Sequence, residues 1–362
     1  METKAKITPF QFYSMLYLCR IFSLAAFMSF EGEGSADLVP RGIVSGIYLI
    51  ITSIPTILLI KKDNQSSVLT RASRISPLFG KIVCVIYLFD FLVYGIITAG
   101  RFNFLVSAVM PTQSNMVVAV LLLIAASAYC AYRGIEGLGR ASVLFLIPVL
   151  LSFAFVFISL FKRFDALNFE PFQWSNASGA VKGGIYFTSV TGEILAVAVS
   201  VPFVKKQKSR HIIILTVLSA VAVIATLAML TGVLGNFSLT RLFGVYTLSS
   251  VAEWGLAERA DAVIICIWMV CAVIKLSFLL FLWDYTLSCL VGKVKTALYL
   301  TLGAFAAAAG TLTLSSEITV FKGFLLSPVV YAIYIVTAVV LPASVLAGEK
   351  ISKKTQKRKW AS

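Results

Sequence analysis

The sequence predicts an all-α polytopic membrane protein with about ten membrane-spanning helices. Of the 362 residues, 59% are hydrophobic and only 13% are charged, and the mean hydropathy is +0.94. Soluble domains are usually about 45–50% apolar and about 25% charged. Apolar runs of roughly 18 or more residues recur along the whole chain, and each can cross the hydrocarbon core as a helix. Because lipid offers no water to pair backbone groups, such runs are expected to be helical.

The predicted spans follow one another with short connections on one side and longer ones on the other, such as 162–182 and 236–259. The first run is too long for a signal peptide and lacks a small-residue cleavage site, so we expect it to be retained as a helix. Glycines interrupt the Ala-rich ninth run. In chain order the predicted spans cover residues 10–30, 43–61, 78–100, 116–133, 140–161, 183–204, 211–235, 260–286, 296–314 and 326–347. We therefore expect one transmembrane domain over residues 1–362, ending in a basic cytoplasmic tail at 348–362.

The net charge is +15, with 31 Lys and Arg against 16 Asp and Glu. Most cations lie at the N-terminus, in the loops after spans 2, 4, 6 and 8, and at the C-terminus, including runs at 205–210 and 353–359. The positive-inside rule then places both termini in the cytoplasm. The basic runs can also contact anionic membrane lipid, although anchoring the topology explains them alone. No nucleic-acid partner is expected, because the membrane accounts for the charge.

Four ionisable residues lie near the middle of predicted spans. They are Arg20 in span 1, Asp90 in span 3, Glu193 in span 6 and Lys275 in span 8. Each costs roughly 2.5–3.5 kcal/mol to insert, so such side chains usually face a bundle interior or a wet cavity. Since two are positive and two negative, pairing would neutralise all four, with Asp90 as counter-ion to Arg20 or Lys275. For Asp90, Arg20 and Lys275, the alternative is a purely structural role, in which an ion pair fixes the helix register.

The positions of these charges divide the chain into two halves of five spans. Span 1 corresponds to span 6 and span 3 to span 8, so the four charges fall only in corresponding spans. Five is odd, so the second half inserts upside down relative to the first. This predicts a LeuT-like inverted repeat, with repeat one at about 8–161 and repeat two at about 183–347, and a ligand site at the midplane.

Span 6 contains a cluster of small and polar residues at its centre. A stretch with two threonines, a glycine and a carboxylate can unwind and free backbone groups for a polar ligand. The alternative is a small-residue face that packs against another helix. Span 1 contains neither glycine nor internal proline, so its break is predicted only by its correspondence with span 6. The candidate ligand-binding residues are Thr188, Thr191, Gly192, Glu193, Arg20, Ser23 and Lys275.

Enzymatic and metal-binding patterns are absent from the sequence. The six cysteines form no CxxC pair, and the single histidine, His211, lies in a basic segment. No HExxH, GxSxG or phosphate-binding glycine loop occurs. We expect no catalytic residues, no metal and no cofactor.

Several short stretches, in order, resemble the B subunit of bacterial spore germinant receptors, a branch of the amino acid–polyamine–organocation transporter superfamily. The stretches are 6–11 (KITPFQ), 132–136 (YRGIE), 192–194 (GEI), 202–206 (PFVKK), 258–262 (ERADA), 267–268 (IW) and 274–277 (IKLS). They extend over nearly the whole chain. The resemblance implies a ten-helix inverted repeat with broken spans 1 and 6, although span 1 lacks the glycine that many members have there. It also implies an amino acid nutrient bound at the centre, and a complex with an A-type and a lipoprotein C-type subunit in the spore inner membrane.

Three hypotheses follow. The first is a subunit that binds a small germinant and signals to partner subunits. The second is a proton-coupled amino acid permease of the same fold, in which Glu193 titrates and Lys275 replaces a coupling cation. The third is an assembly subunit without a ligand. The sequence does not separate the first two, because one site serves both.

Overall fold

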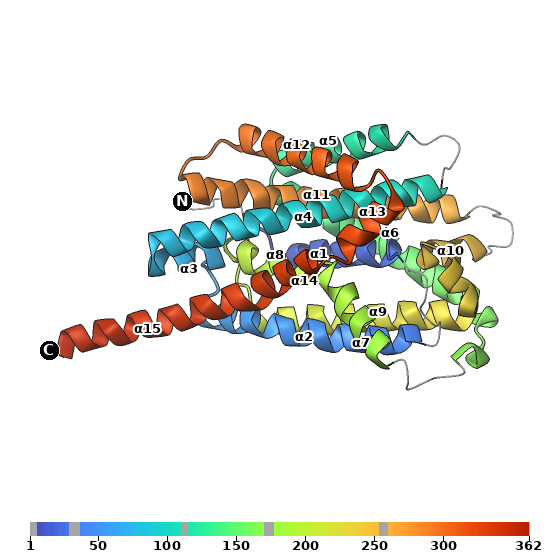
Figure 1. Ribbon diagram of the computed structural model, residues 1–362, viewed down its shortest axis with the longest axis horizontal. Helices are drawn as coiled ribbons and strands as arrows, with labels where there is room; N and C mark the ends of the chain where they lie inside the picture. Colours follow the sequence, from blue (N-terminus) through green and yellow to red (C-terminus); the bar gives the residue numbers. More distant parts are fainter. Residues whose placement is uncertain (1–5, 29–36, 110–114, 170–176, 253–259, 362) are drawn as a thin grey trace.

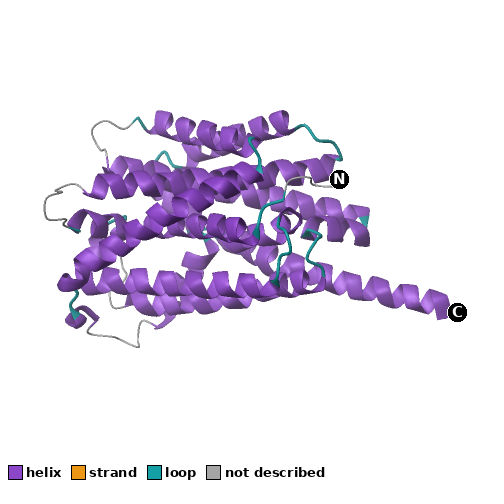
Figure 2. Cartoon of the chain, turned by 180° about the vertical axis from the view of Figure 1, so that it is seen from behind, coloured by secondary structure: helices purple, strands orange, loops and turns teal. Residues whose placement is uncertain are grey.

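The computed structural model describes residues 6–28, 37–109, 115–169, 177–252 and 260–361, and this part of the chain is nearly all helix (Figures 1 and 2). The α-helices are α1 (Pro9–Ala25), α2 (Leu38–Lys62), α3 (Val68–Ile75), α4 (Pro77–Val109), α5 (Met116–Tyr132), α6 (Ile135–Leu160), α7 (Ala177–Ser189), α8 (Glu193–Ser200), α9 (Ser209–Leu234), α10 (Gly244–Val251), α11 (Ala260–Val291), α12 (Thr296–Leu314), α13 (Ile318–Leu325), α14 (Pro328–Ile335) and α15 (Leu341–Ala361). A π-helical segment, Val336–Val340, joins α14 to α15.

The protein is a multi-pass membrane protein. Among the described residues, eight helical stretches are long and apolar enough to cross a membrane, by length and composition. The first and fourth predicted spans correspond to α1 and α5, which have 17 residues each. At about 1.5 Å per residue, such a helix falls a little short of the roughly 30 Å of a hydrocarbon core. Eight long spans therefore follow from these criteria, rather than the ten predicted.

Several helices extend beyond the predicted limits. The third span continues as α4 to Val109, and the second begins at Leu38. Arg101 and Arg41, which the sequence places in outward loops, therefore lie inside helices and are buried. The predicted boundaries were wrong here because apolar residues continue on both sides of each arginine. At the other end of the chain, α15 carries the basic tail onward as helix and projects from the bundle (Figure 1).

The helix packing follows the two-fold pattern of an inverted repeat. The third span (α4) packs against the eighth and ninth (α11 and α12), and the eighth packs against the third and fourth (α4 and α5). The second and seventh spans, α2 and α9, pack against each other. The short helices α3 and α10 follow corresponding spans and lie at opposite ends of the bundle (Figure 1). Upside-down insertion of the second half predicts this arrangement.

Four basic segments gather at one end of the bundle. The backbone N–H of Ile7 donates to the carbonyl of Phe203 (2.9 Å), and that of Lys205 donates to Ile7 (2.9 Å). Asn64, after the second span, donates to the carbonyl of Gln207 (3.1 Å). The N-terminal segment, the loops after spans 2 and 6, and α15 thus share one end, as the predicted topology requires.

Arg71 of α3 fastens the C-terminal helix to this end. Its guanidinium donates to both carboxylate oxygens of Glu349 in α15 (2.6 and 2.7 Å) and to the carbonyl of Leu59 (2.6 Å). Arg71 is buried, whereas Arg74 of the same helix is 68% exposed.

Replacing Arg71 with methionine keeps the packing volume but removes three charge-assisted hydrogen bonds. We expect Arg71→Met to lower the free energy of unfolding by about 2–3 kcal/mol, measured by thermal unfolding in detergent.

Arg74→Met is the matched control, because Arg74 is exposed and its ion pair with the partly exposed Asp63 is long, at 3.7 Å. We expect the control to change stability by no more than about 0.5 kcal/mol. Equal stability losses in the two variants would contradict the role of Arg71.

Candidate functional site

The sixth span is broken at its centre. Helix α7 ends at Ser189, α8 begins at Glu193, and Gly192 between them has φ +68°, in the left-handed region. A Cβ at Gly192 would lie 2.6 Å from ring carbons of Tyr94, so both the conformation and the space require glycine. The hydroxyl of Tyr94 donates to the carbonyl of Ser189 (2.5 Å) and satisfies one acceptor that the break exposes. The predicted break of span 6 is confirmed.

Three of the four predicted midplane charges meet at this break. Arg20 Nη1 lies 3.3 Å from Glu193 Oε2 and donates to the hydroxyl of Thr191 (2.7 Å). Lys275 Nζ lies 2.8 Å from Glu193 Oε1. Ser23 Oγ donates to the same carboxylate oxygen (2.5 Å). One carboxylate at the start of α8 therefore joins α1, α11 and the broken span.

Lys275 lies in a shell of oxygen atoms from three parts of the chain. Its Nζ donates to Ser23 Oγ (2.6 Å) in α1, to the backbone carbonyl of Thr191 (2.8 Å) in the break and to Glu193 (2.8 Å). The Thr191 carbonyl can accept this bond because the helix is interrupted there. Three acceptors match the three donors of an ammonium group.

Thr188 has a different part in the site. Its hydroxyl lies 2.8 Å from Ser45 Oγ and donates to the Ser45 carbonyl (3.1 Å), so it ties α7 to α2. Its own carbonyl accepts from the hydroxyl of Thr191 (2.8 Å). Thr188 thus positions the break. Its hydrogen bonds go to Ser45 and Thr191, and not to the charged cluster of Arg20, Glu193 and Lys275.

The first span remains helical through both of its predicted site residues. Helix α1 contains Arg20 and Ser23 and ends at Ala25, followed by buried non-helical residues up to Met28. The helix therefore stops within the predicted span 10–30. The last two residues of that span, 29 and 30, lie outside the described residues, so the predicted break of span 1 stays a prediction.

Asp90 does not form the predicted ion pair. Its carboxylate accepts one hydrogen bond, from Thr337 (3.1 Å), and its second oxygen has no partner. No cation among the described residues lies within 4 Å of it, although it is fully buried. Both midplane cations are instead taken by Glu193, so the expectation of pairwise neutralisation was wrong for Asp90.

This difference predicts a mild phenotype for Asp90→Asn. Asparagine keeps the acceptor for Thr337 and removes a group whose charged form is costly to bury without a cation. We expect unchanged or slightly higher thermal stability and membrane abundance. If Asp90 held a cation, the same change would cost about 3–5 kcal/mol and abundance would fall.

Arg101 is a buried cation that the sequence reasoning missed. It is 1% exposed, and its Nε and Nη2 atoms have no hydrogen-bond partner. Arg101 acts electrostatically on both Arg20 and Lys275, so it belongs to the same interior. The mostly apolar residues 102–106 after it, Phe, Asn, Phe, Leu and Val, were the signal that the span continues. Arg20 and Lys275 pair with the carboxylate of Glu193, and Arg101 adds a third positive charge to this interior, which leaves an excess of positive charge.

The charged cluster is closely packed. Two small cavities touch Glu193, one of about 20 Å³ beside Arg20 and one of about 10 Å³ beside Lys275. Each has room for about one water molecule. A small organic ligand can therefore bind at Glu193 only by displacing side chains that now occupy the site.

A comparison with known protein families shows to which family this chain belongs. The family described as "spore germination protein" (the spore permease family) matches residues 42–317. The chain belongs to this family. The match includes Asp90, the break at 188–193 and Lys275, and it begins after Arg20 and Ser23. Among curated proteins, none matches this chain.

Among solved structures, a manganese transporter of Eremococcus coleocola, crystallised with an aromatic bis-isothiourea substituted compound, is similar. The TM-score is 0.49 with 11% identity, over 95% of this chain and 80% of the transporter chain.

The family membership and the long apolar helices make this chain a permease-like protein of the membrane. Three stretches that carry the resemblance have structural roles. Thr8 and Gln11 form the capping box of α1, residues 202–206 include the pairing with Ile7, and Gly134 provides a positive φ between α5 and α6. Of the stretch 258–262, the first two residues lie outside the described chain.

Proposed function

We propose that this protein is the membrane subunit of a spore germination nutrient receptor, which binds a free amino acid at the break of the sixth span. The observation that carries the proposal is the oxygen shell around Lys275 Nζ, built by Ser23, Thr191 and Glu193. An α-ammonium group needs the same three acceptors at the same distances. The ligand's ammonium therefore takes the place of the Lys275 ammonium.

The positive excess of the site supports a ligand that also carries a carboxylate. Displaced Lys275 needs a new anion, and a zwitterionic amino acid brings one. Arg20 offers two further donors, Nε and Nη2, which are buried and have no partner. Arg101 offers another two. Because buried donors without partners are costly, a carboxylate there is stabilised by more than its Coulomb attraction.

The exchange also supplies a signal. Lys275 now holds α11 against both α1 and the break. When the ligand takes over these acceptors, that direct link between the repeats is lost and a ligand-bridged one replaces it. A ligand shifts such an equilibrium by its difference in affinity for the two arrangements. An A-type and a lipoprotein C-type subunit in the spore inner membrane then receive the shift. The basic end of the bundle faces the cytoplasm, as the positive-inside rule requires.

Binding to the purified chain tests this proposal. The twenty protein amino acids, each radiolabelled, are equilibrated with the protein in proteoliposomes. We expect saturable binding of at least one of them, without accumulation inside the vesicles. The double variant E193Q/K275Q keeps the net charge of the cluster but loses the ammonium shell, so we expect it to fold and not to bind. Equal binding by this variant, or no binding of any amino acid by the wild-type chain, contradicts the proposed site.

A proton-coupled amino acid permease is the second candidate, favoured by the position of Lys275 where a coupling cation would serve. In this candidate the coupled proton binds the carboxylate of Glu193 and removes its negative charge from the ion pair with Lys275. This candidate predicts concentrative uptake by the same proteoliposomes when the outside is acidified. Absence of pH-driven uptake, together with binding, favours the receptor.

A further inference from the structure

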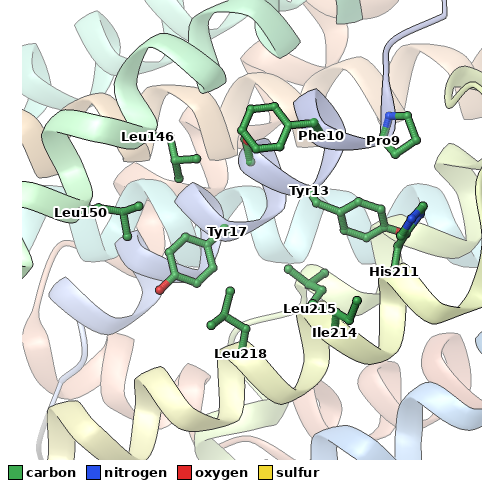
Figure 3. A pocket seen from close by; sticks show the side chains of 11 residues that line it. Pro9, Phe10, Tyr13, Tyr17, Leu146, Leu150, His211, Ile214, Leu215 and Leu218 are labelled. Carbon is green, nitrogen blue, oxygen red and sulfur yellow. The ribbon is translucent and has the colours of Figure 1, made fainter.

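An apolar groove opens on the side of the bundle between α1, α6 and α9 (Figure 3). It encloses about 710 Å³, within the range of roughly 300–1,000 Å³ that holds a small molecule. Phe10, Leu150, Ile214 and Leu218 on its walls are 41–62% exposed, so the groove faces the lipid and not the protein interior. Its lining residues are Pro9, Phe10, Tyr13, Ser14, Tyr17, Leu146, Leu150, His211, Ile214, Leu215 and Leu218.

The polar end of the groove is positively charged. His211 closes this end beside Tyr13, with their rings 5.6 Å apart (Figure 3). Lys208 and Arg210 flank His211 and act on it electrostatically. The exposed Arg140 lies on α6 before the groove begins, and Glu136 is the acid of that helix's first turn. Cations therefore outnumber acids at this end.

The helix directions add to this charge. Ile7 would contact a Cβ at Gly139, which places the start of α6 beside the start of α1. The ring contact of Tyr13 with His211 places the start of α9 there too. Three helices thus begin at the same end of the groove, and helix N-termini carry partial positive charge. A ligand with an apolar body and an anionic head fits this arrangement.

We propose that the groove binds an anionic glycerophospholipid, with one acyl chain along α1, α6 and α9 and the phosphate head at Lys208, Arg210 and His211. Charge complementarity selects this occupant over a neutral lipid, since basic residues at a membrane surface attract anionic lipid. A wall one side chain thick separates the acyl chain from the charged site. Leu215 lines both the groove and the small cavity beside Arg20 and Glu193.

The test is lipid binding to the delipidated protein by native mass spectrometry. Phosphatidylglycerol and phosphatidylcholine with identical palmitoyl and oleoyl chains are titrated separately. We expect the wild-type chain to bind phosphatidylglycerol roughly tenfold more tightly. The double variant K208Q/R210Q should bind both lipids about equally. Leu150→Trp, which fills the groove, should weaken the binding of both.

Matched controls lie close by. Leu151→Trp changes the next residue of α6, which is 64% exposed but is not among the residues that line the groove. K293Q/K295Q removes two exposed lysines from the loop after α11. Both controls should bind the two lipids as the wild type does. Only variants whose thermal stability equals that of the wild type enter the comparison.

Two results overturn the proposal. One is equal affinity of the wild-type chain for the two lipids. The other is capture of a polypeptide, rather than lipid, by a photoreactive amino acid placed at Leu218 in native membranes. That second result makes the groove a docking site for a partner helix. Neither result depends on whether the break in span 6 binds an amino acid.

Discussion

Replacement of Glu193 with glutamine is expected to destabilise the protein by about 3–5 kcal/mol, because it leaves two buried cations without their carboxylate. Arg20 and Lys275 are 2% and 6% exposed, and Glu193 is the acid that both contact. Glutamine retains the volume and one acceptor, so the loss is electrostatic. Thermal unfolding in lipid nanodiscs and the amount of protein in membranes measure the effect.

The double variant E193Q/K275Q separates charge balance from general damage to the fold. Removing one cation together with the carboxylate restores the net charge of the cluster, so we expect recovery of at least half of the lost stability. A double-mutant cycle gives the coupling energy between the two residues. Glu136→Gln, at an exposed position in the first turn of α6, is the control and should behave as wild type. Full wild-type stability of Glu193→Gln alone contradicts the central role of this carboxylate.

Replacement of Gly192 with alanine is expected to cost about 2–5 kcal/mol, from a left-handed backbone and an overpacked contact. The added methyl group meets the ring of Tyr94, whose hydroxyl holds the Ser189 carbonyl. The break must then shift, and with it the Thr191 carbonyl that accepts from Lys275. Thermal unfolding reports the destabilisation, and amino acid binding at a temperature where the variant is folded reports the shift.

Gly179→Ala is the matched control in the same broken span. Gly179 lies in α7, and a Cβ there meets no atom within 4 Å. Alanine favours a helix over glycine by roughly 0.5–1 kcal/mol, so this control should be neutral or slightly stabilising. Were both glycine variants equally tolerated, the conformation of Gly192 would have no special importance.

Much of the fold could be predicted from the sequence, because lipid imposes simple rules on it. Long apolar runs located each span, and the cost of buried charge brought Arg20, Glu193 and Lys275 to one point. Gly192, between two threonines and a carboxylate, marked the break in span 6. These predictions rest on local composition and on strong, general energies, so they do not depend on how particular helices pack.

The predictions that were wrong depended on packing. Asp90 was expected to have a cation, but only the packed bundle shows that Glu193 takes both. Arg101 was placed in a loop, because one arginine in an apolar run resembles the end of a span. The lipid-facing groove could not be predicted, since its walls come from three helices far apart in sequence. The oxygen shell around Lys275 could not be predicted either, because it includes a backbone carbonyl.

The ammonium-binding character of this shell can be measured directly. In Lys275→Ala the side chain is gone, and Ser23, the Thr191 carbonyl and Glu193 remain without their shared donor. If these oxygens form a site for an α-ammonium group, added ethylammonium should raise the melting temperature of this variant in a saturable manner. Tetramethylammonium at equal ionic strength cannot donate hydrogen bonds and should not do so, and neither salt should affect the wild-type chain. Equal responses of the variant to the two salts would contradict the proposal that a nutrient's ammonium replaces Lys275.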